Sequence, residues 1–314
     1  MSLPLVSIIT PSFNQVAYLE QAIRSVLEQD YPAVEYFIVD GGSTDGSVEL
    51  IQKYAARLAW WVSEKDHGQA DAINKGLRRA NGEIVAWLNS DDYYLPGAVA
   101  EAVAALQATP QAGLVYGNAF SIDPAGRQTK TFVFPSYGLI DLMAFRIICQ
   151  PAVFMRRSVL EQAGHLDLTY HYMLDHHLWL RIAKHAPVLH VSSVWAAARY
   201  HPAAKNVVQA PAFGRETLRL LEWMKSQPDF APLVARHRHK IEAGAYRLNA
   251  RYLLDGDLPG PALGSYAHAL LRDPRYALKH WHRMLYALLS LAGGKGLAKM
   301  VHRLRLPTPE VNVS

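Results

Sequence analysis

Short apolar runs alternate with longer amphipathic segments along the first third of the chain. In the longer segments the apolar side chains recur every three or four residues, which is the period of a helix with one buried face. The runs predict strands at residues 6–10, 36–40, 60–63 and 83–88, and the segments predict helices at 18–29, 46–57, 69–80 and 97–108. Strands that alternate with helices of this length form right-handed crossovers, so the pattern predicts a mostly parallel sheet flanked by helices.

The rhythm becomes less regular after about residue 113. Short strand-like runs at 113–116, 131–134 and 152–155 predict that the sheet continues with mixed strand directions. A further helix is expected to begin near Leu174 and to end at Pro187, because proline cannot continue a helix.

From Phe213 onward the pattern is helical only. We therefore expect two domains: an α/β domain at 1–206 with a Rossmann-like, mixed and mostly parallel sheet, and an all-helical C-terminal extension at 207–314. Half of the 314 residues are hydrophobic, which is enough for a sizeable buried core.

The cysteine content and the apolar segments bear on the cellular compartment of the protein. Cys149 is the single cysteine, so intramolecular disulfides and cysteine-based zinc sites are excluded and a reducing compartment is favoured. The first residues show no charged segment followed by an apolar core, and the run 284–292 is well short of the ~20 residues that cross a bilayer. We therefore expect a cytoplasmic protein that does not span a membrane.

Charge is distributed unevenly along the chain. Residues 1–206 hold 16 Lys and Arg against 19 Asp and Glu, whereas residues 207–314 hold 16 against 8, which gives net charges of −3 and +8. No nucleic-acid-binding motif accompanies the basic region, so we expect no nucleic acid partner. The basic tail instead predicts peripheral contact with the anionic inner face of a membrane, with solvated helix faces as the alternative. The expected contacts are Arg236, Arg238, Lys240, Lys279, Lys299, Arg303 and Arg305, with Trp281 as an interfacial anchor.

Two adjacent carboxylates, Asp91 and Asp92, follow the predicted strand at 83–88. Neighbouring carboxylates repel each other, so a bound cation would stabilise the pair. The carboxyl ends of strands in an α/β sheet face the crevice where such folds bind ligands, and oxygen ligands suit Mg²⁺ or Mn²⁺. The alternative is a surface turn before Pro96, since Asn, Ser and Asp are common turn residues.

Polar residues also follow the first two predicted strands. Thr10, Pro11 and Ser12 come between the first strand and the first helix, where hydroxyl groups and a helix N-terminus can hold a nucleotide base or phosphate; the alternative is that Ser12 caps the helix. Asp40 ends the second strand and precedes two glycines, so its carboxylate is a candidate acceptor for a base N–H, with an ordinary turn as the alternative.

These loops occur in the order found in family 2 glycosyltransferases, which the chain resembles over roughly residues 4–206. The resemblance lies in the segments 6–14, 38–46, 71–76, 89–92, 164–167 and 175–181. It implies a GT-A fold and an inverting transfer of a hexose from a nucleotide-diphospho-sugar, most plausibly a UDP-sugar, to an acceptor hydroxyl. It also implies Mn²⁺ or Mg²⁺ as cofactor, a glycan or lipid-linked acceptor, and a place in cell-surface polysaccharide or glycan synthesis.

The resemblance also implies roles for individual residues. Asp40 matches the family's base-binding aspartate, Asp91 its ribose or donor-sugar contact, and Asp92 its metal ligand. Asp71 matches an aspartate near the nucleotide. Lys75 lies four residues later on the same predicted helix face, where it can pair with Asp71.

Three further residues are matched in the later half of the resemblance. Asp175 resembles the catalytic base, with helix capping as the alternative. His201 resembles a histidine that some relatives use as a metal or pyrophosphate ligand, against the ordinary interpretation of a buried histidine. Gln150 is expected to border the acceptor pocket or simply to pack.

The chain departs from the family pattern at two positions. Gly41 stands where many relatives carry a second acid, and Asn89 stands where many carry an aspartate. The acidic cluster is one carboxylate weaker, so the metal is expected to depend on the donor diphosphate for part of its ligand shell. The alternative function is a non-catalytic nucleotide-sugar-binding module whose helical tail recruits partners.

Overall fold

The computed structural model describes residues 3–293, which form two compact units. The first unit comprises the chain up to Leu139 together with Ile147–Tyr200. The second comprises Ile140–Arg146 together with the chain from His201 onward. The predicted domain boundary after residue 206 stays a prediction.

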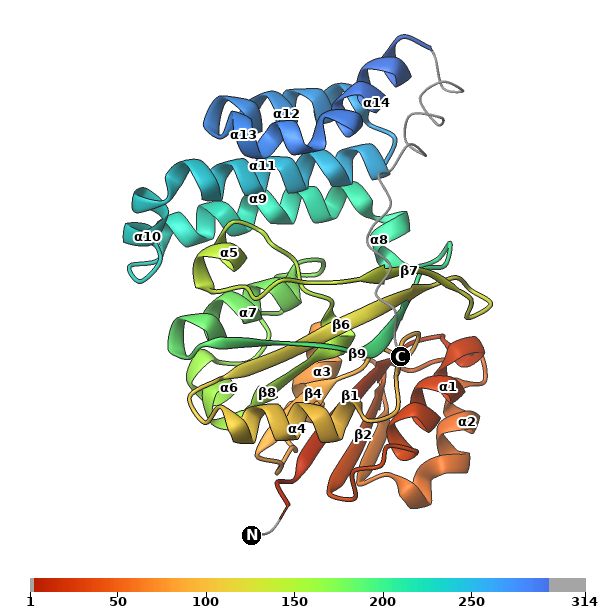
Figure 1. Ribbon diagram of the computed structural model, residues 1–314. Coiled ribbons are helices and arrows are strands. Elements are labelled where there is room, and N and C mark those ends of the chain that lie inside the picture. The colour runs from red at the N-terminus through yellow and green to blue at the C-terminus, as the bar shows by residue number, and fades with distance from the viewer. Residues whose placement is uncertain (1–2, 294–314) are drawn as a thin grey trace. The chain divides into compact units, whose positions relative to one another are not determined.

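The first unit contains one mixed sheet (Figure 1). Its strands run in the order β3-β2-β1-β4-β8-β6-β9-β5, and β7 pairs with the outer part of β6. The strands are β1 (Val6–Ser12), β2 (Val34–Asp40), β3 (Trp60–Ser63), β4 (Ile84–Trp87), β5 (Tyr93–Tyr94), β6 (Leu114–Ile122), β7 (Gln128–Phe132), β8 (Val153–Arg156) and β9 (Val188–Arg199).

The first four strands are parallel, and the later strands add antiparallel pairs. β1 pairs in parallel with β2 and β4, and β2 with β3, whereas β8 runs antiparallel to both β4 and β6. The register places Ser12, Asp40 and Ser63 side by side across three strands. The sequence-based expectation of a Rossmann-like, mixed and mostly parallel sheet is confirmed, and the polar ends of β1 to β3 form one edge.

Helices cover this sheet (Figure 1). They are α1 (Val16–Leu27), α2 (Ser47–Tyr54), α3 (Gln69–Leu77), α4 (Ala98–Ala108), α6 (Arg157–Ala163) and α7 (Leu174–His185), with single turns at Ala55–Arg57 and Gln150–Ala152. In α1, Leu19, Ile23 and Val26 recur at helical spacing and are buried against Val6 and Ile8 of β1 in the main core.

Two features of the sheet differ from the sequence-based prediction. β1 continues to Ser12, so Thr10, Pro11 and Ser12 are strand residues and not a loop after the strand. The prediction also missed β9, a strand of 12 residues. Its second half is rich in alanine, which has low strand propensity, and parallel pairing with β6 supplies what the local sequence lacks.

The second unit is helical. It contains α8 (Lys205–Val208), α9 (Ala210–Ser226), α10 (Ala231–Arg236), α11 (Arg238–Asp255), α12 (Pro259–Arg272), α13 (Pro274–Ala277), the turn Leu278–His280 and α14 (Trp281–Leu291), while α5 (Leu139–Met143) lies where the chain first enters this unit. Within it α9 packs on α11, α11 on α12, and α12 on α14 (Figure 1). The predicted helical character of this region is confirmed for the residues that the structure describes.

No helix between residues 3 and 293 is both long enough and apolar enough to cross a membrane. Of the predicted lipid contacts in the basic tail, Lys299, Arg303 and Arg305 lie outside the described residues.

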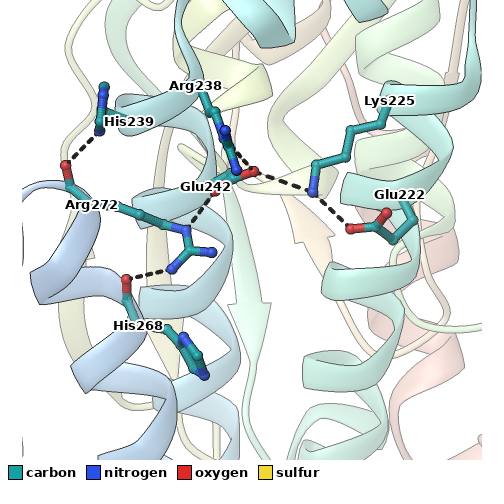
Figure 2. Close-up of polar contacts among 7 residues, drawn as sticks. All are labelled: Glu222, Lys225, Arg238, His239, Glu242, His268 and Arg272. Atoms are coloured by element: carbon teal, nitrogen blue, oxygen red, sulfur yellow. Dashed lines mark hydrogen bonds and ion pairs between the residues drawn. The ribbon is translucent and has the colours of Figure 1, made fainter.

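A buried carboxylate joins the helices of the second unit (Figure 2). The Glu242 side chain on α11 is only 3% exposed and pairs with Lys225 of α9 at 3.2 Å, with Arg238 at 3.2 Å and with Arg272 of α12 at 2.5 Å. Burial alone would raise the pKa of Glu242, but the hydrogen bonds and charges of Arg272 and Lys225 outweigh burial and lower it. One charge on α11 therefore fixes both neighbouring helices.

We expect Glu242→Gln to lower the free energy of unfolding by about 2–3 kcal/mol, because the amide leaves three cations without their shared countercharge. Urea unfolding measures the change. Because the folded-state pKa of Glu242 is lowered, its stabilisation is present above the unfolded pKa and is lost as the pH falls through the folded one. The difference from wild type should therefore shrink below about pH 4.

Glu222→Gln is the matched control, since the Glu222 side chain is 70% exposed although it also pairs with Lys225. We expect a change within about 0.5 kcal/mol. Equal losses for the two variants would show that the buried network does not hold the helices together.

Candidate functional site

The Asp40 carboxylate organises the carboxyl edge of β1 to β3. Its Oδ2 accepts hydrogen bonds from Gly42 N (3.0 Å), Ser43 N (2.8 Å) and Ser63 Oγ (2.7 Å), and its Oδ1 accepts from Ser43 Oγ (2.5 Å). Asp40 is fully buried and thus fixes the turn that follows β2. A carboxylate oxygen has two lone pairs, so Oδ1 keeps acceptor capacity at the sheet edge.

The loops after β1 and β2 are tied to each other. Asn14 N donates to Ser43 Oγ (2.8 Å), and Thr44 N donates to Asn14 Oδ1 (2.9 Å). Val16 N, in the first turn of α1, donates to Asp45 Oδ2 (2.9 Å). The N-cap residue of α1 is Gln15, whose side chain makes no capping hydrogen bond, so neither Ser12 nor Asn14 caps this helix. The Asp45 carboxylate accepts the hydrogen bond from the first N–H of the helix.

Burial alone would raise the pKa of Asp45, but hydrogen bonds from Ser47 and Val16 outweigh it and lower the pKa. Sequence reasoning missed Asp45, because its partner on α1 is distant along the chain.

The hydroxyl groups at the end of β1 have different surroundings. Thr10 Oγ1 accepts a hydrogen bond from Tyr36 OH (2.8 Å) inside the sheet, so Thr10 is a core residue. Ser12 is 3% exposed and lies beside Asp40, and its Oγ has no hydrogen-bond partner among residues 3–293. A buried hydroxyl without a partner is costly and is most easily explained by a bound ligand or water. Ser12 is therefore the member of the predicted trio best placed to bind.

Gly41 leaves room for a carboxylate from another loop. A Cβ at position 41 would lie 2.8 Å from Asp66 Oδ2 and 3.3 Å from the Phe13 ring. Asp66 Oδ1 accepts from Gly68 N (2.8 Å), which fixes the loop after β3. The Asp66 carboxylate therefore lies directly beside Gly41. Sequence reasoning missed Asp66.

Asp71 and Lys75 lie on one face of α3, as their spacing predicts. Lys75 Nζ is 2.8 Å from Glu64 Oε1 and 3.6 Å from Asp71 Oδ2, so Glu64 is its closer partner. The hydrogen bond to Glu64 raises the pKa of Lys75 against the opposing effect of burial. Asp71 Oδ2 also accepts from His67 N (3.1 Å), so Asp71 fixes the loop between β3 and α3.

Asp92 is a buried carboxylate at the end of the β4 loop, 6% exposed. Its Oδ1 accepts from Arg199 N (2.9 Å) and its Oδ2 from Asn89 Nδ2 (3.2 Å). Burial and the neighbouring charge of Asp91 raise the pKa of Asp92 well above its usual range, and the hydrogen bond from Arg199 N opposes them. The pair therefore concentrates negative charge at a place with poor access to water.

The Arg199 guanidinium clamps this loop. Nε donates to the Asp91 carbonyl (3.0 Å), Nη1 to the carbonyls of Asp123 and Pro124 (both 3.1 Å), and Nη2 to Gln21 Oε1 (2.6 Å). Arg199 is 5% exposed. Because the guanidinium bonds carbonyl and amide oxygens, only the backbone N–H of Arg199 reaches the Asp92 carboxylate. Sequence reasoning assigned Arg199 no role, and an arginine at the end of an apolar run was the available signal.

Amide side chains connect the acidic loop to its neighbours. Asn89 Nδ2 donates to Gln150 Oε1 (3.0 Å) as well as to Asp92, and Asn89 Oδ1 accepts from Gln69 Nε2 (2.7 Å). Gln150 Nε2 donates to the Trp87 carbonyl (2.8 Å). Gln150 thus lies beside the acidic loop, where hydrogen bonds hold both ends of its amide.

Asp175 lies in the first turn of α7 and is oriented by the packing of that helix. Met173 is the N-cap residue, so Asp175 does not cap the helix. Trp179 lies four residues after Asp175, on the same helix face, and stacks on Trp87 of β4 with ring centroids 5.0 Å apart. This contact brings α7 against the strand that leads to Asp91 and Asp92.

The charges of Asp92 and Asp175 both act on the pKa of the Cys149 thiol. Burial raises the pKa of Cys149, and the charges of Asp92 and Asp175 raise it further. Both residues belong to the first unit, and the stack of Trp179 on Trp87 packs the helix that carries Asp175 against the strand that leads to Asp92.

His201 is buried and begins the second segment of the second unit. Its assignment as a metal ligand stays a prediction. In the described part of the chain, no three His, Cys, Asp or Glu side chains gather as a metal site. Asp91 and Asp92 could offer carboxylate oxygens, the ligand type of a hard cation such as Mg²⁺ or Mn²⁺ that takes further ligands from a substrate diphosphate and water.

Comparisons with known proteins agree on the family. The sequence model of glycosyl transferase family 2 matches residues 7–164, half of the chain. An uncharacterized glycosyltransferase of Mycobacterium tuberculosis is 31% identical over 185 residues, which cover 58% of this chain and 70% of that protein. TuaG of Bacillus subtilis, whose name assigns it to teichuronic acid biosynthesis, is 47% identical over 92 residues, 28% of this chain and 36% of TuaG.

Solved structures agree on the fold. TarS of S. aureus (residues 1–349), in complex with UDP-GlcNAc, superposes with a TM-score of 0.58 at 15% identity and covers 95% of this chain and 90% of that one. The mannosyltransferase PcManGT of Pyrobaculum calidifontis, in complex with GDP-Man and Mn²⁺, gives 0.63 at 21% identity, with 96% and 82% covered.

The solved structures share the fold of this chain, and the sequence comparisons share its family. Membership of an enzyme family favours an enzyme over a non-catalytic binding module. The chain therefore belongs to glycosyl transferase family 2 and is a glycosyltransferase with a GT-A fold.

Proposed function

We propose that the protein transfers a sugar, with inversion, from a nucleotide-diphospho-sugar to an acceptor hydroxyl in the presence of Mn²⁺ or Mg²⁺. The observation that carries the proposal is the stack of Trp179 on Trp87 (ring centroids 5.0 Å apart), which packs the helix that bears Asp175 against the strand that leads to Asp91 and Asp92. A site for this reaction needs one carboxylate for a cation and another for the acceptor proton. The donors in the similar structures, UDP-GlcNAc and GDP-Man, support a nucleotide-sugar.

The nucleotide end of the donor is assigned to the edge of β1 to β3. Ser12 has a buried hydroxyl and Asp40 has acceptor capacity on Oδ1, and the two lie side by side. Asp71 fixes the neighbouring loop. A uracil ring presents an N–H donor and carbonyl acceptors, which these groups complement, so we propose a UDP-sugar as the donor.

The cation is assigned to Asp91 and Asp92. A buried carboxylate with a raised pKa and an acidic neighbour gains most from a divalent cation. Bound there, Mn²⁺ or Mg²⁺ would neutralise the charge that develops on the leaving diphosphate. Asn89 and Gln150 hold the loop by neutral hydrogen bonds, so they leave its net negative charge unchanged.

Asp175 is the proposed base. The acceptor oxygen attacks the anomeric carbon from the face opposite the diphosphate, its proton passes to the Asp175 carboxylate, and the bond between the sugar and the diphosphate breaks. A single displacement of this kind inverts the anomeric configuration. The stack of Trp179 on Trp87 holds the helix that carries Asp175, so the base is on a rigid element. A glycan or lipid-linked acceptor in cell-surface polysaccharide synthesis fits the assignment of TuaG.

Asp175→Asn should lower kcat by about 10²–10⁴-fold with little change in donor affinity, because the amide cannot accept the acceptor proton. Transfer is measured with the UDP- or GDP-sugar that most stabilises the protein against heat in the presence of Mn²⁺. The exposed Asp30→Asn is the matched control and should keep wild-type activity. Wild-type turnover by Asp175→Asn would remove this residue from the mechanism.

Asp92→Asn should abolish the Mn²⁺-dependent part of UDP binding and lower transfer by at least about 10²-fold, since the site loses its buried anionic ligand. The probe is UDP, titrated by calorimetry with Mn²⁺ and with EDTA. Wild-type protein should bind UDP more weakly in EDTA, and Asp92→Asn should bind equally in both. Retention of the Mn²⁺ effect would place the cation elsewhere.

Gly41→Ala should weaken UDP binding by about tenfold, because the new methyl group meets the Asp66 carboxylate at 2.8 Å and displaces that side chain from its place beside Gly41. The control is Gly138→Ala, where a Cβ meets no heavy atom within 4 Å. Calorimetry with UDP and Mn²⁺ compares the two. Equal affinities for both variants and wild type would show that the loop at Asp66 takes no part in donor binding.

A further inference from the structure

A cationic pocket of ≈310 Å³ opens on the second unit. Its wall contains Arg146, Lys240, Arg275 and Lys279, with one acid, Asp273, and the ring of Tyr276. Asp273 Oδ1 accepts from Tyr276 N (2.9 Å) and caps α13, while Lys240 Nζ is 2.8 Å from Asp141. With Asp141 included, four cations face two acids.

The interior beside this pocket is also electropositive. Burial, together with the charges of Arg247, Arg283, His282 and Arg146, lowers the pKa of His280 to about 3. The Arg146 guanidinium lies 4.7 Å from the centre of the Tyr276 ring. Close packing fixes the inner wall, since a Cβ at Gly244 of α11 would lie 2.1 Å from the Ala144 carbonyl oxygen. The cations therefore lie beside closely packed backbone, where α11 contacts Ala144.

An exposed apolar face adjoins the pocket. Leu278 precedes the pocket residue Lys279 and is 54% exposed, and Trp281, Leu288 and Leu291 are 59%, 54% and 56% exposed. Leu278, Trp281 and Leu288 recur at three- and seven-residue spacing along the turn Leu278–His280 and α14, so they lie along one face. Met284 and Ala287 lie on the same side of α14 and pack with Ala262 and Tyr266 of α12, so the exposed apolar side chains continue the packed stripe of this helix.

The sequence around this face is one-sided in charge. Residues 274–309 contain seven Lys and Arg and no Asp or Glu. Exposed apolar side chains with an interfacial tryptophan, next to a pocket in which cations outnumber acids, complement a surface that is apolar below an anionic layer.

We propose that the second unit docks on an anionic phospholipid surface, with the lipid phosphate in the pocket of Arg146, Lys240, Arg275 and Lys279 and the acyl region against Leu278, Trp281, Leu288 and Leu291. The inference concerns binding only and does not rest on the proposed transfer reaction. It narrows the contacts expected from sequence, because Arg238 is paired with Glu242 and does not line the pocket.

The test is flotation of the full chain with phosphatidylcholine vesicles that contain or lack phosphatidylglycerol. We expect flotation with the anionic vesicles only, and a steep loss of binding as salt is added. Arg275→Gln/Lys279→Gln should lower vesicle partitioning by about tenfold or more, and Trp281→Ser/Leu288→Ser should lower it as well. Thermal unfolding of each variant checks that it is folded.

Arg215→Gln/Arg219→Gln is the matched control, because it removes the same charge from exposed positions of α9 and should leave partitioning unchanged. An equal loss in this control would overturn the pocket as the site. So would salt-independent or absent flotation of the wild-type chain, which needs no variant. A dimer in sedimentation equilibrium that Trp281→Ser dissociates would assign the apolar face to a second copy and overturn the proposal.

Discussion

The acidic loop of this glycosyltransferase depends on one buried arginine. Arg199 bonds the Asp91 carbonyl, two further carbonyls and Gln21 through its guanidinium, and it reaches the Asp92 carboxylate only through its backbone N–H. The loop is therefore held by a cation that does not form an ion pair with the acid it positions. Burial and the charge of Asp91 raise the pKa of Asp92 although the backbone N–H and the charge of Arg199 lower it, and a divalent cation would stabilise the ionised carboxylate.

At the carboxyl ends of β1 to β3, carboxylates hold the backbone of the loops through hydrogen bonds. Asp40 receives four hydrogen bonds from its own turn and from β3, and Asp45 receives the first N–H of α1. Gly41 lies in the same turn, and the absence of a side chain there leaves space for the Asp66 carboxylate.

The two units handle positive charge differently. In the helical unit, Glu242 is shared by three cations from three helices, and this buried network stabilises the packing of α9, α11 and α12. Toward α13 and α14 the cations outnumber the acids, and exposed apolar side chains accompany them. The buried Glu242 network is typical of contacts that hold helices together. The excess of cations beside exposed apolar side chains is typical of a surface that binds an anionic partner.

The sequence by itself determined the alternation of strands and helices, the parallel first half of the sheet and the strand ends that carry Asp40, Asp91 and Asp92, because hydrophobic period and turn residues act locally. The family followed from motif order. β9, the Arg199 clamp and the approach of Asp66 to Gly41 were decided only by the tertiary structure. The bond from Arg199 to Asp92 joins residues 107 positions apart, and no local pattern encodes such a contact. The grouping of Asp175 with Asp92 likewise required the stack of Trp179 on Trp87, because helix packing sets which face of α7 meets the sheet.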